Sequence, residues 1–85
     1  MKSLPRAGSV VGVGTRFGRV IRQLREQRGW SQEQLAHRAE LNRTYMGEIE
    51  RATAMASLAT AAKLAHALEL PLSSLISRCE ESSSA

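Results

Sequence analysis

The residue types that most often carry catalysis or bind metals do not fall at the spacing of a site in this 85-residue chain. His37 and His66 fall on different predicted helices, and neither has a cysteine or carboxylate at the spacing of a metal-ligand set. The serines occur at predicted helix starts and in the tail, without a nucleophile-elbow pattern, and no paired carboxylates mark a pocket. We therefore expect no enzymatic activity, no metal and no cofactor.

A different chemistry is indicated within residues 30–51, where hydrogen-bonding side chains share one side of a short helical pattern. Arg43, Thr44 and Glu48 fall opposite an apolar stripe at helical spacing. Such a helix buries the stripe and offers its polar side to a groove of a partner molecule.

Local signals predict two short helices that hold these side chains. Ser31 and Gln34 have the spacing of a capping box, which predicts a helix beginning at Gln32. Asn42 is a suitable N-cap for the second helix. The inward positions are Leu35, Ala36 and Ala39 in the first helix and Met46 and Ile49 in the second.

Three further helices are expected around this pair. Apolar positions at helical spacing predict a helix from about Arg16 to Arg28, with Gly29 as its left-handed C-cap. Ser57 is expected to cap a fourth helix that Leu70-Pro71 ends. A short fifth helix would carry an apolar face that either closes the core or joins a partner subunit; its residues are Leu72, Leu75 and Ile76.

Charge is distributed unevenly along the chain. Residues 1–51 carry ten basic and five acidic side chains, a net +5, whereas residues 52–85 carry two basic and three acidic, a net −1, which together give the overall +4. A basic half favours a polyanion such as DNA through neutralisation of phosphates. A solvated arginine-rich face explains the composition alone equally well.

The sequence also bears on location. Met1–Gly14 lacks the long apolar core of a secretory signal, and no apolar run reaches the length of a membrane span. The single cysteine, Cys79, fits a reducing compartment. We expect a cytoplasmic protein with no membrane association and no evident small-molecule ligand.

From Phe17 to Ile76 the chain resembles the lambdoid phage repressor and Cro family of regulators, also called the XRE family. The resemblance rests on Ser31-Gln32-Glu33-x-Leu35-Ala36 followed by Tyr45-Met46-x-x-Ile49-Glu50-Arg51. Within it, Arg43-Thr44-Tyr45 and Ile49-Glu50-Arg51 are similar to the controller proteins of restriction-modification systems.

The resemblance implies an all-α fold, a five-helix lambda-repressor-like domain with a helix-turn-helix. We expect this DNA-binding domain at residues 15–78, a flexible arm at 1–14 and a disordered tail at 79–85. It also implies a sequence-specific regulator of transcription that binds double-stranded DNA as a homodimer on a pseudo-palindromic operator.

Site residues carry over by position in the motif. The implied base contacts are Arg43, Thr44, Tyr45 and Glu48, and the implied phosphate contacts are Gln32, Asn42 and Arg51. An ion pair between Arg25 and Glu50 is implied, as is a dimer interface that contains Leu72, Leu75 and Ile76.

The chain departs from the family pattern after Arg51. Ala52 stands where the family usually has glycine, and Met55 stands where a polar residue is usual, so the left-handed turn and a phosphate contact are open questions. An exposed Met55 would instead indicate a protein contact. The alternative function is an antitoxin-like or protein-interaction module whose helices bind a protein partner.

Overall fold

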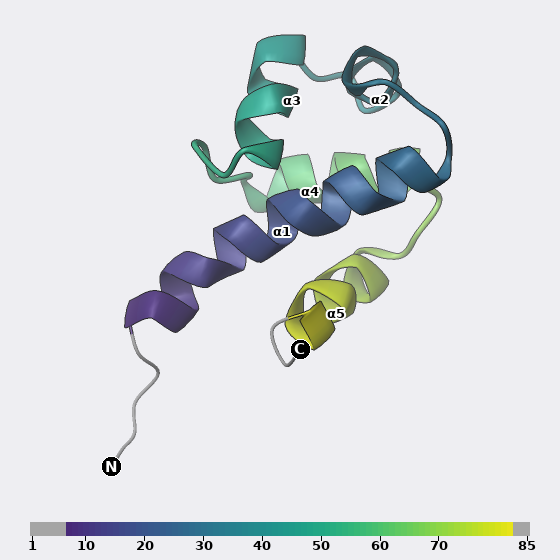
Figure 1. Ribbon diagram of the computed structural model, residues 1–85. Helices are drawn as coiled ribbons and strands as arrows, with labels where there is room; N and C mark the ends of the chain where they lie inside the picture. The colour runs from purple at the N-terminus through teal and green to yellow at the C-terminus, as the bar shows by residue number, and fades with distance from the viewer. Residues whose placement is uncertain (1–6, 83–85) are drawn as a thin grey trace.

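The computed structural model describes residues 7–82, which form five helices and, within that range, no strand. This confirms the all-α prediction. The helices are α1 (Ala7–Gln27), α2 (Gln32–Arg38), α3 (Arg43–Glu50), α4 (Leu58–Ala67) and α5 (Leu72–Ser82). In Figure 1, α2 and α3 lie above α1, α5 lies below it, and α4 runs behind it. Contacts of α1 with α3 and α5, and of α4 with α2 and α5, close the bundle.

The core lies between these helices, and the inward positions predicted for α2 and α3 are buried in it. Its fully buried large side chains come from all five helices: Ile21, Leu35, Met46, Ile49, Leu64, Leu68 and Leu75. Each short helix depends on this packing, because isolated helices of two or three turns are marginal in water.

The N-caps form as predicted. Ser31 and Gln34 make both hydrogen bonds of the capping box at the start of α2. The side-chain oxygens of Asn42 and Ser57 accept from backbone N–H groups in the first turns of α3 and α4. These bonds satisfy donors that the helix leaves without partners and set where each helix begins.

The ends of the first four helices share one geometry. Each is followed by a residue with positive φ: Gly29, Glu40, Ala52 and Glu69. The next residue donates its N–H back to the helix, as in the 2.8 Å bond from Leu41 N to Ala36 O, which is the Schellman arrangement. Only one of the four positions is glycine, so three side chains accept a backbone conformation that L-residues disfavour.

The ends of the chain differ from the expectation. Helix α1 begins at Ala7, so residues 7–14, expected as part of a flexible arm, are helical. A Cβ placed on Gly14 would lie 3.2 Å from the Met55 Cε, so the loop after α3 packs closely against the backbone of this part of α1. At the other end, α5 continues to Ser82 and Cys79 is buried, so the ordered region extends beyond residue 78. Residues 1–6 and 83–85, the remainder of the expected arm and tail, lie outside the described residues.

Within residues 7–82, none of the helices is both long enough and apolar enough to cross a membrane.

Candidate nucleic-acid interface

Helix α3 buries one side and leaves its first turn in solvent. Met46 and Ile49 are buried in the core, whereas Arg43 and Thr44 are exposed. Within the described chain, neither Arg43 nor Thr44 forms a side-chain hydrogen bond or ion pair. Their hydrogen-bonding groups are therefore available to a ligand.

The other two predicted base contacts lie in more restricted settings. Glu48 is half-buried on the same helix. Tyr45 is half-buried and packs against the core, and its hydroxyl donates to the Met55 carbonyl over 3.5 Å. This contact joins α3 to the loop that follows it, so Tyr45 is less free than Arg43 or Thr44.

The predicted phosphate contacts surround this helix and differ in how far they are engaged. The Asn42 Oδ1 accepts from the Tyr45 N–H over 3.1 Å, which leaves its amide N–H groups unused. The Gln32 Nε2 donates to the Glu50 Oε1 over 2.9 Å, and one of its two N–H groups remains. Arg51 is exposed at the C-cap of α3.

Arg25 and Glu50 form the ion pair that the resemblance implies. The Arg25 Nε donates to the Glu50 Oε2 over 2.7 Å, and its Nη2 donates to the Glu50 Oε1 over 3.0 Å. A third bond, from Nη1 to the Trp30 carbonyl at 2.8 Å, fixes the turn after α1. The side chains are only 12% and 3% exposed, and the hydrogen bond to Glu50 raises the pKa of Arg25 above its ordinary value. Together with Gln32, the pair ties α1, α2 and α3 to each other.

Two glycines make close contacts at α3 and were not predicted as functional residues. A Cβ on Gly18 would lie 2.8 Å from the Glu50 carbonyl oxygen, so its absence lets the end of α3 approach α1. A Cβ on Gly47 would lie 2.9 Å from the Arg51 Nη1. A glycine inside a helical pattern is itself a signal of close approach, although the contacting partner cannot be read from it.

The structure resolves the question about the turn after α3. Ala52 has a φ of 62°, and its N–H donates to the Ile49 carbonyl over 3.1 Å. The left-handed turn is therefore present without the usual glycine. Met55, three residues on, is 63% exposed.

The fifth helix requires a correction. Leu75 is fully buried in the chain's own core, so it cannot present its side chain to a second subunit in this conformation. Leu72 is half-buried against the same core, and only Ile76 of the three expected interface residues is largely exposed, at 39%. The apolar face of α5 therefore serves mainly to close the core.

An apolar groove does occur nearby, between α1, the α3–α4 loop, α4 and α5. It encloses about 200 Å³ and is lined by Val13, Phe17, Met55, Ala56, Ser57, Leu58, Ala61 and Ile76. Among residues 12–81, all the exposed large hydrophobic side chains line this groove: Val13, Met55, Leu58 and Ile76. We call this surface the apolar groove.

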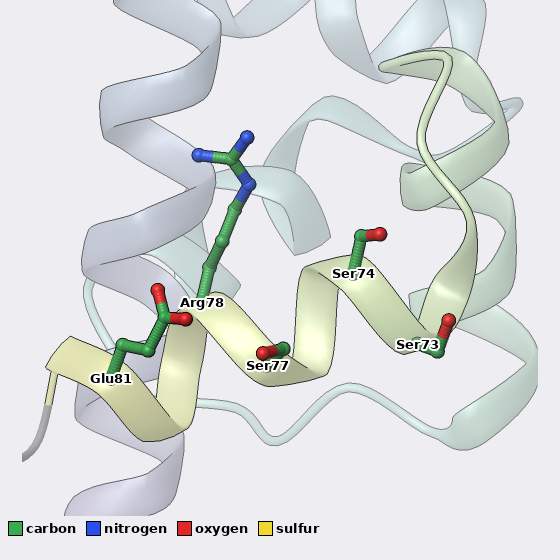
Figure 2. Close-up of a pocket in the computed structure, with 5 residues that line it drawn as sticks. All are labelled: Ser73, Ser74, Ser77, Arg78 and Glu81. Carbon is green, nitrogen blue, oxygen red and sulfur yellow. The ribbon is translucent and has the colours of Figure 1, made fainter.

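A second, polar hollow of about 580 Å³ lies on α5. Figure 2 shows Ser73, Ser74 and Ser77 spread along the helix, with Arg78 and Glu81 toward its C-terminal end. Its lining side chains are exposed or half-buried, which is typical of a solvated helix surface. In the described part of the chain, no group of three or more His, Cys, Asp or Glu side chains is placed to hold a metal ion.

The chain is similar to known proteins in sequence and in structure. Residues 21–75 match the helix-turn-helix family. The chain is 40% identical over 57 residues to the HTH-type transcriptional regulator SutR of Escherichia coli (strain K12), covering 67% of this chain and 32% of that protein. It is 43% identical over 53 residues to the control protein C.BamHI of Bacillus amyloliquefaciens, covering 61% of this chain and 65% of that protein. The chain thus spans less than two thirds of either relative.

A solved structure extends the comparison. The restriction-modification controller protein C.AhdI of Aeromonas hydrophila superposes with a TM-score of 0.70 at 40% identity, covering 73% of this chain and 94% of that one. These similarities confirm the resemblance that the sequence indicated.

Proposed function

Because the chain belongs to the helix-turn-helix family, we propose that it is a sequence-specific DNA-binding regulator of transcription that acts in the cytoplasm as a homodimer. The observation that carries the proposal is that α3 is held firmly by the rest of the chain while side chains at its first turn are free to bind a ligand. The buried Arg25–Glu50 pair holds α3, while Arg43 and Thr44 at its first turn have no partner within residues 7–82.

In this proposal, α3 lies in the major groove with its N-terminal residues at base edges. Arg43 has the geometry for a bidentate contact with guanine, and Thr44 suits a thymine methyl group or a hydrogen bond. Glu48 accepts from a cytosine amine. Tyr45 contacts a base or a phosphate if its hydroxyl leaves the Met55 carbonyl.

Phosphate contacts set the register of the helix. Gln32 keeps one amide N–H group and Asn42 keeps two that can donate to phosphate oxygens, and Arg51 adds a charge-assisted donor. The names of the relatives support a regulatory role: one is a transcriptional regulator and two are control or controller proteins.

The apolar groove supports the homodimer. A two-fold symmetric interface brings together the same patch of both subunits, so that patch must be complementary to itself. Leu58 protrudes from the patch at 73% exposure, and the recess lies beside it. We therefore place Val13, Met55, Leu58 and Ile76 at the dimer contact, whereas Leu72 and Leu75 pack in or against the core of their own chain.

Selection of bound sequences from random DNA at about 150 mM salt tests the function. We expect a two-fold symmetric motif with half-sites about one helical turn, roughly 34–36 Å, apart. Arg43→Ala should cost about 1–3 kcal/mol per half-site and relax specificity at one base pair. Arg78→Ala on α5 removes the same charge from an exposed position and should leave the motif unchanged. Equal losses for Arg43→Ala on selected and random DNA would contradict its role.

Sedimentation of Leu58→Asp tests the dimer. A charge in the apolar groove should leave the helical circular dichroism unchanged, because Leu58 is outside the core, and should yield a monomer.

The same groove favours the second candidate function, a module that binds a protein partner. Absence of any selected motif, with only salt-sensitive binding to random DNA, would support that alternative.

A further inference from the structure

Gly47 lies in the middle of α3, on a side of the helix that faces other parts of the chain. It is buried, and glycine is unfavourable inside a helix. A Cβ at this position would lie 2.9 Å from the Arg51 Nη1 and 3.5 Å from the Gln32 Oε1. Arg51 thus turns back by one helical turn, and its guanidinium and the Gln32 amide oxygen both lie next to the bare backbone of Gly47.

The side chain of Gln32 is held in place by Glu50. Its Nε2 donates to the Glu50 Oε1 over 2.9 Å, and the same carboxylate is bound by Arg25. Because the amide nitrogen is fixed by Glu50, the amide oxygen faces Gly47 and offers a partial negative charge beside the Arg51 guanidinium. The buried ion pair therefore restricts the Gln32 side chain. Gln32 and the bare backbone of Gly47 in turn form the surface against which the Arg51 side chain lies.

We propose that Gly47 is a positioning residue for DNA: it lets Arg51 lie beside Gln32 so that both side chains grip one phosphate of the DNA backbone. The inference rests on the proposed function and identifies how that surface holds the polyanion. A guanidinium already placed against the helix loses less side-chain entropy on binding than a free one. A phosphate held at this point also fixes how far α3 enters the groove, and so which bases Arg43 reaches.

A double-mutant cycle of Gly47→Ala and Arg51→Ala tests this link. The methyl group of Gly47→Ala displaces only the flexible end of Arg51, and alanine is the better helix former, so the thermal midpoint should hold or rise. Each phosphate contact contributes about −0.9 to the slope of log affinity on log salt, so losing one per half-site should flatten the slope of a dimer by about 1.8. We expect this change for Gly47→Ala, for Arg51→Ala and, without further loss, for the double variant. Selected and random DNA should weaken by the same factor.

Gly12→Ala is the matched control. A Cβ on Gly12 would lie 3.0 Å from the Arg16 Nη1, so the same chemical change displaces an arginine in α1, away from α3. The salt slope of this variant should equal that of the original chain.

Three results would overturn the proposal. An unchanged slope for Gly47→Ala would show that Arg51 needs no seat on the backbone. Additive losses in the cycle would show that the methyl group clashes with DNA itself. A loss restricted to selected DNA would place Gly47 or Arg51 at a base edge. If the original chain shows neither a selected motif nor salt-dependent binding, it is the proposed function that fails. The double-mutant cycle then gives no test of Gly47, and the two failures can be told apart.

Discussion

Replacing Arg25 by methionine should be among the most damaging single changes in this domain. The substitution removes three donated hydrogen bonds, two to Glu50 at 2.7 and 3.0 Å and one to the Trp30 carbonyl at 2.8 Å. The Glu50 side chain is only 3% exposed, so its carboxylate would remain buried with the Gln32 amide as its partner. Breaking a buried pair in this way costs about 3–5 kcal/mol.

The cost of Arg25→Met is a large fraction of the free energy of unfolding of the whole domain. Domains of this size have an unfolding free energy of about 4–13 kcal/mol, from roughly 0.05–0.15 kcal/mol per residue. Glu50→Gln should cost less, about 1.5–3 kcal/mol, because Arg25 keeps the Trp30 carbonyl and some solvent contact, and the amide oxygen still accepts. The double variant Arg25→Met/Glu50→Gln should be more stable than Arg25→Met alone, since no buried charge is stranded.

Urea unfolding followed by helical circular dichroism, at one fixed protein concentration, measures these differences. Arg22 provides the matched control. Its ion pair with Glu26 has a similar length, 3.0 Å, but the side chains are 64% and 53% exposed. Arg22→Met should therefore cost less than about 0.5 kcal/mol. A loss below 1 kcal/mol for Arg25→Met, or a double variant no more stable than Arg25→Met, would refute the argument that the buried pair holds α3.

Three further outcomes follow from the packing and the helix ends. Gly18→Ala should lower the unfolding free energy by about 1–3 kcal/mol in urea unfolding, because its methyl group would press on the α3 backbone; a neutral result would mean that α1 and α3 can separate freely. Ala52→Gly should raise the thermal midpoint, since relief of a left-handed alanine, about 1–2 kcal/mol, exceeds the cost of glycine in the unfolded chain, about 0.5–1 kcal/mol. Burial raises the pKa of the Cys79 thiol above its ordinary 9.0, so above pH 9.0 the native state keeps a proton that the unfolded state loses. The free energy of unfolding that this proton contributes is fully present below pH 9.0 and should decline as the pH rises further. Urea midpoints measured from pH 7 to 10.5 should show this decline in the original chain and not in Cys79→Ala.

The sequence predicted the local features of the fold correctly because their signals lie within a few residues. Ser31, Asn42 and Ser57 cap helices as expected, since a capping bond spans three residues. The buried apolar side chains of α2 and α3 follow from apolar spacing alone, whereas Leu58 has the spacing of a buried position in α4 and is 73% exposed.

Features that depend on contacts between distant segments were missed or misjudged. Residues 7–14 contain glycines that suggest a flexible arm, yet these residues form the first turns of α1. Gly14 there lies close to the side chain of Met55, a contact that the sequence does not indicate. Leu75 was assigned to a subunit contact because spacing shows that a face is apolar but not what covers it. The close approach at Gly18 was not predicted, because its contact is with the end of α3, which no local pattern specifies.

The structure separates the residues that fix α3 from those that would read DNA. Gly18, Arg25 and Gln32 hold its second half through close packing and a buried hydrogen-bond network, whereas Arg43 and Thr44 project from the first half without partners in the described chain. Substitutions at the free positions therefore disturb no contact that supports the fold. A change of operator preference should accordingly be reachable at Arg43 and Thr44 with little loss of stability, while changes in the supporting network should reduce binding to every sequence.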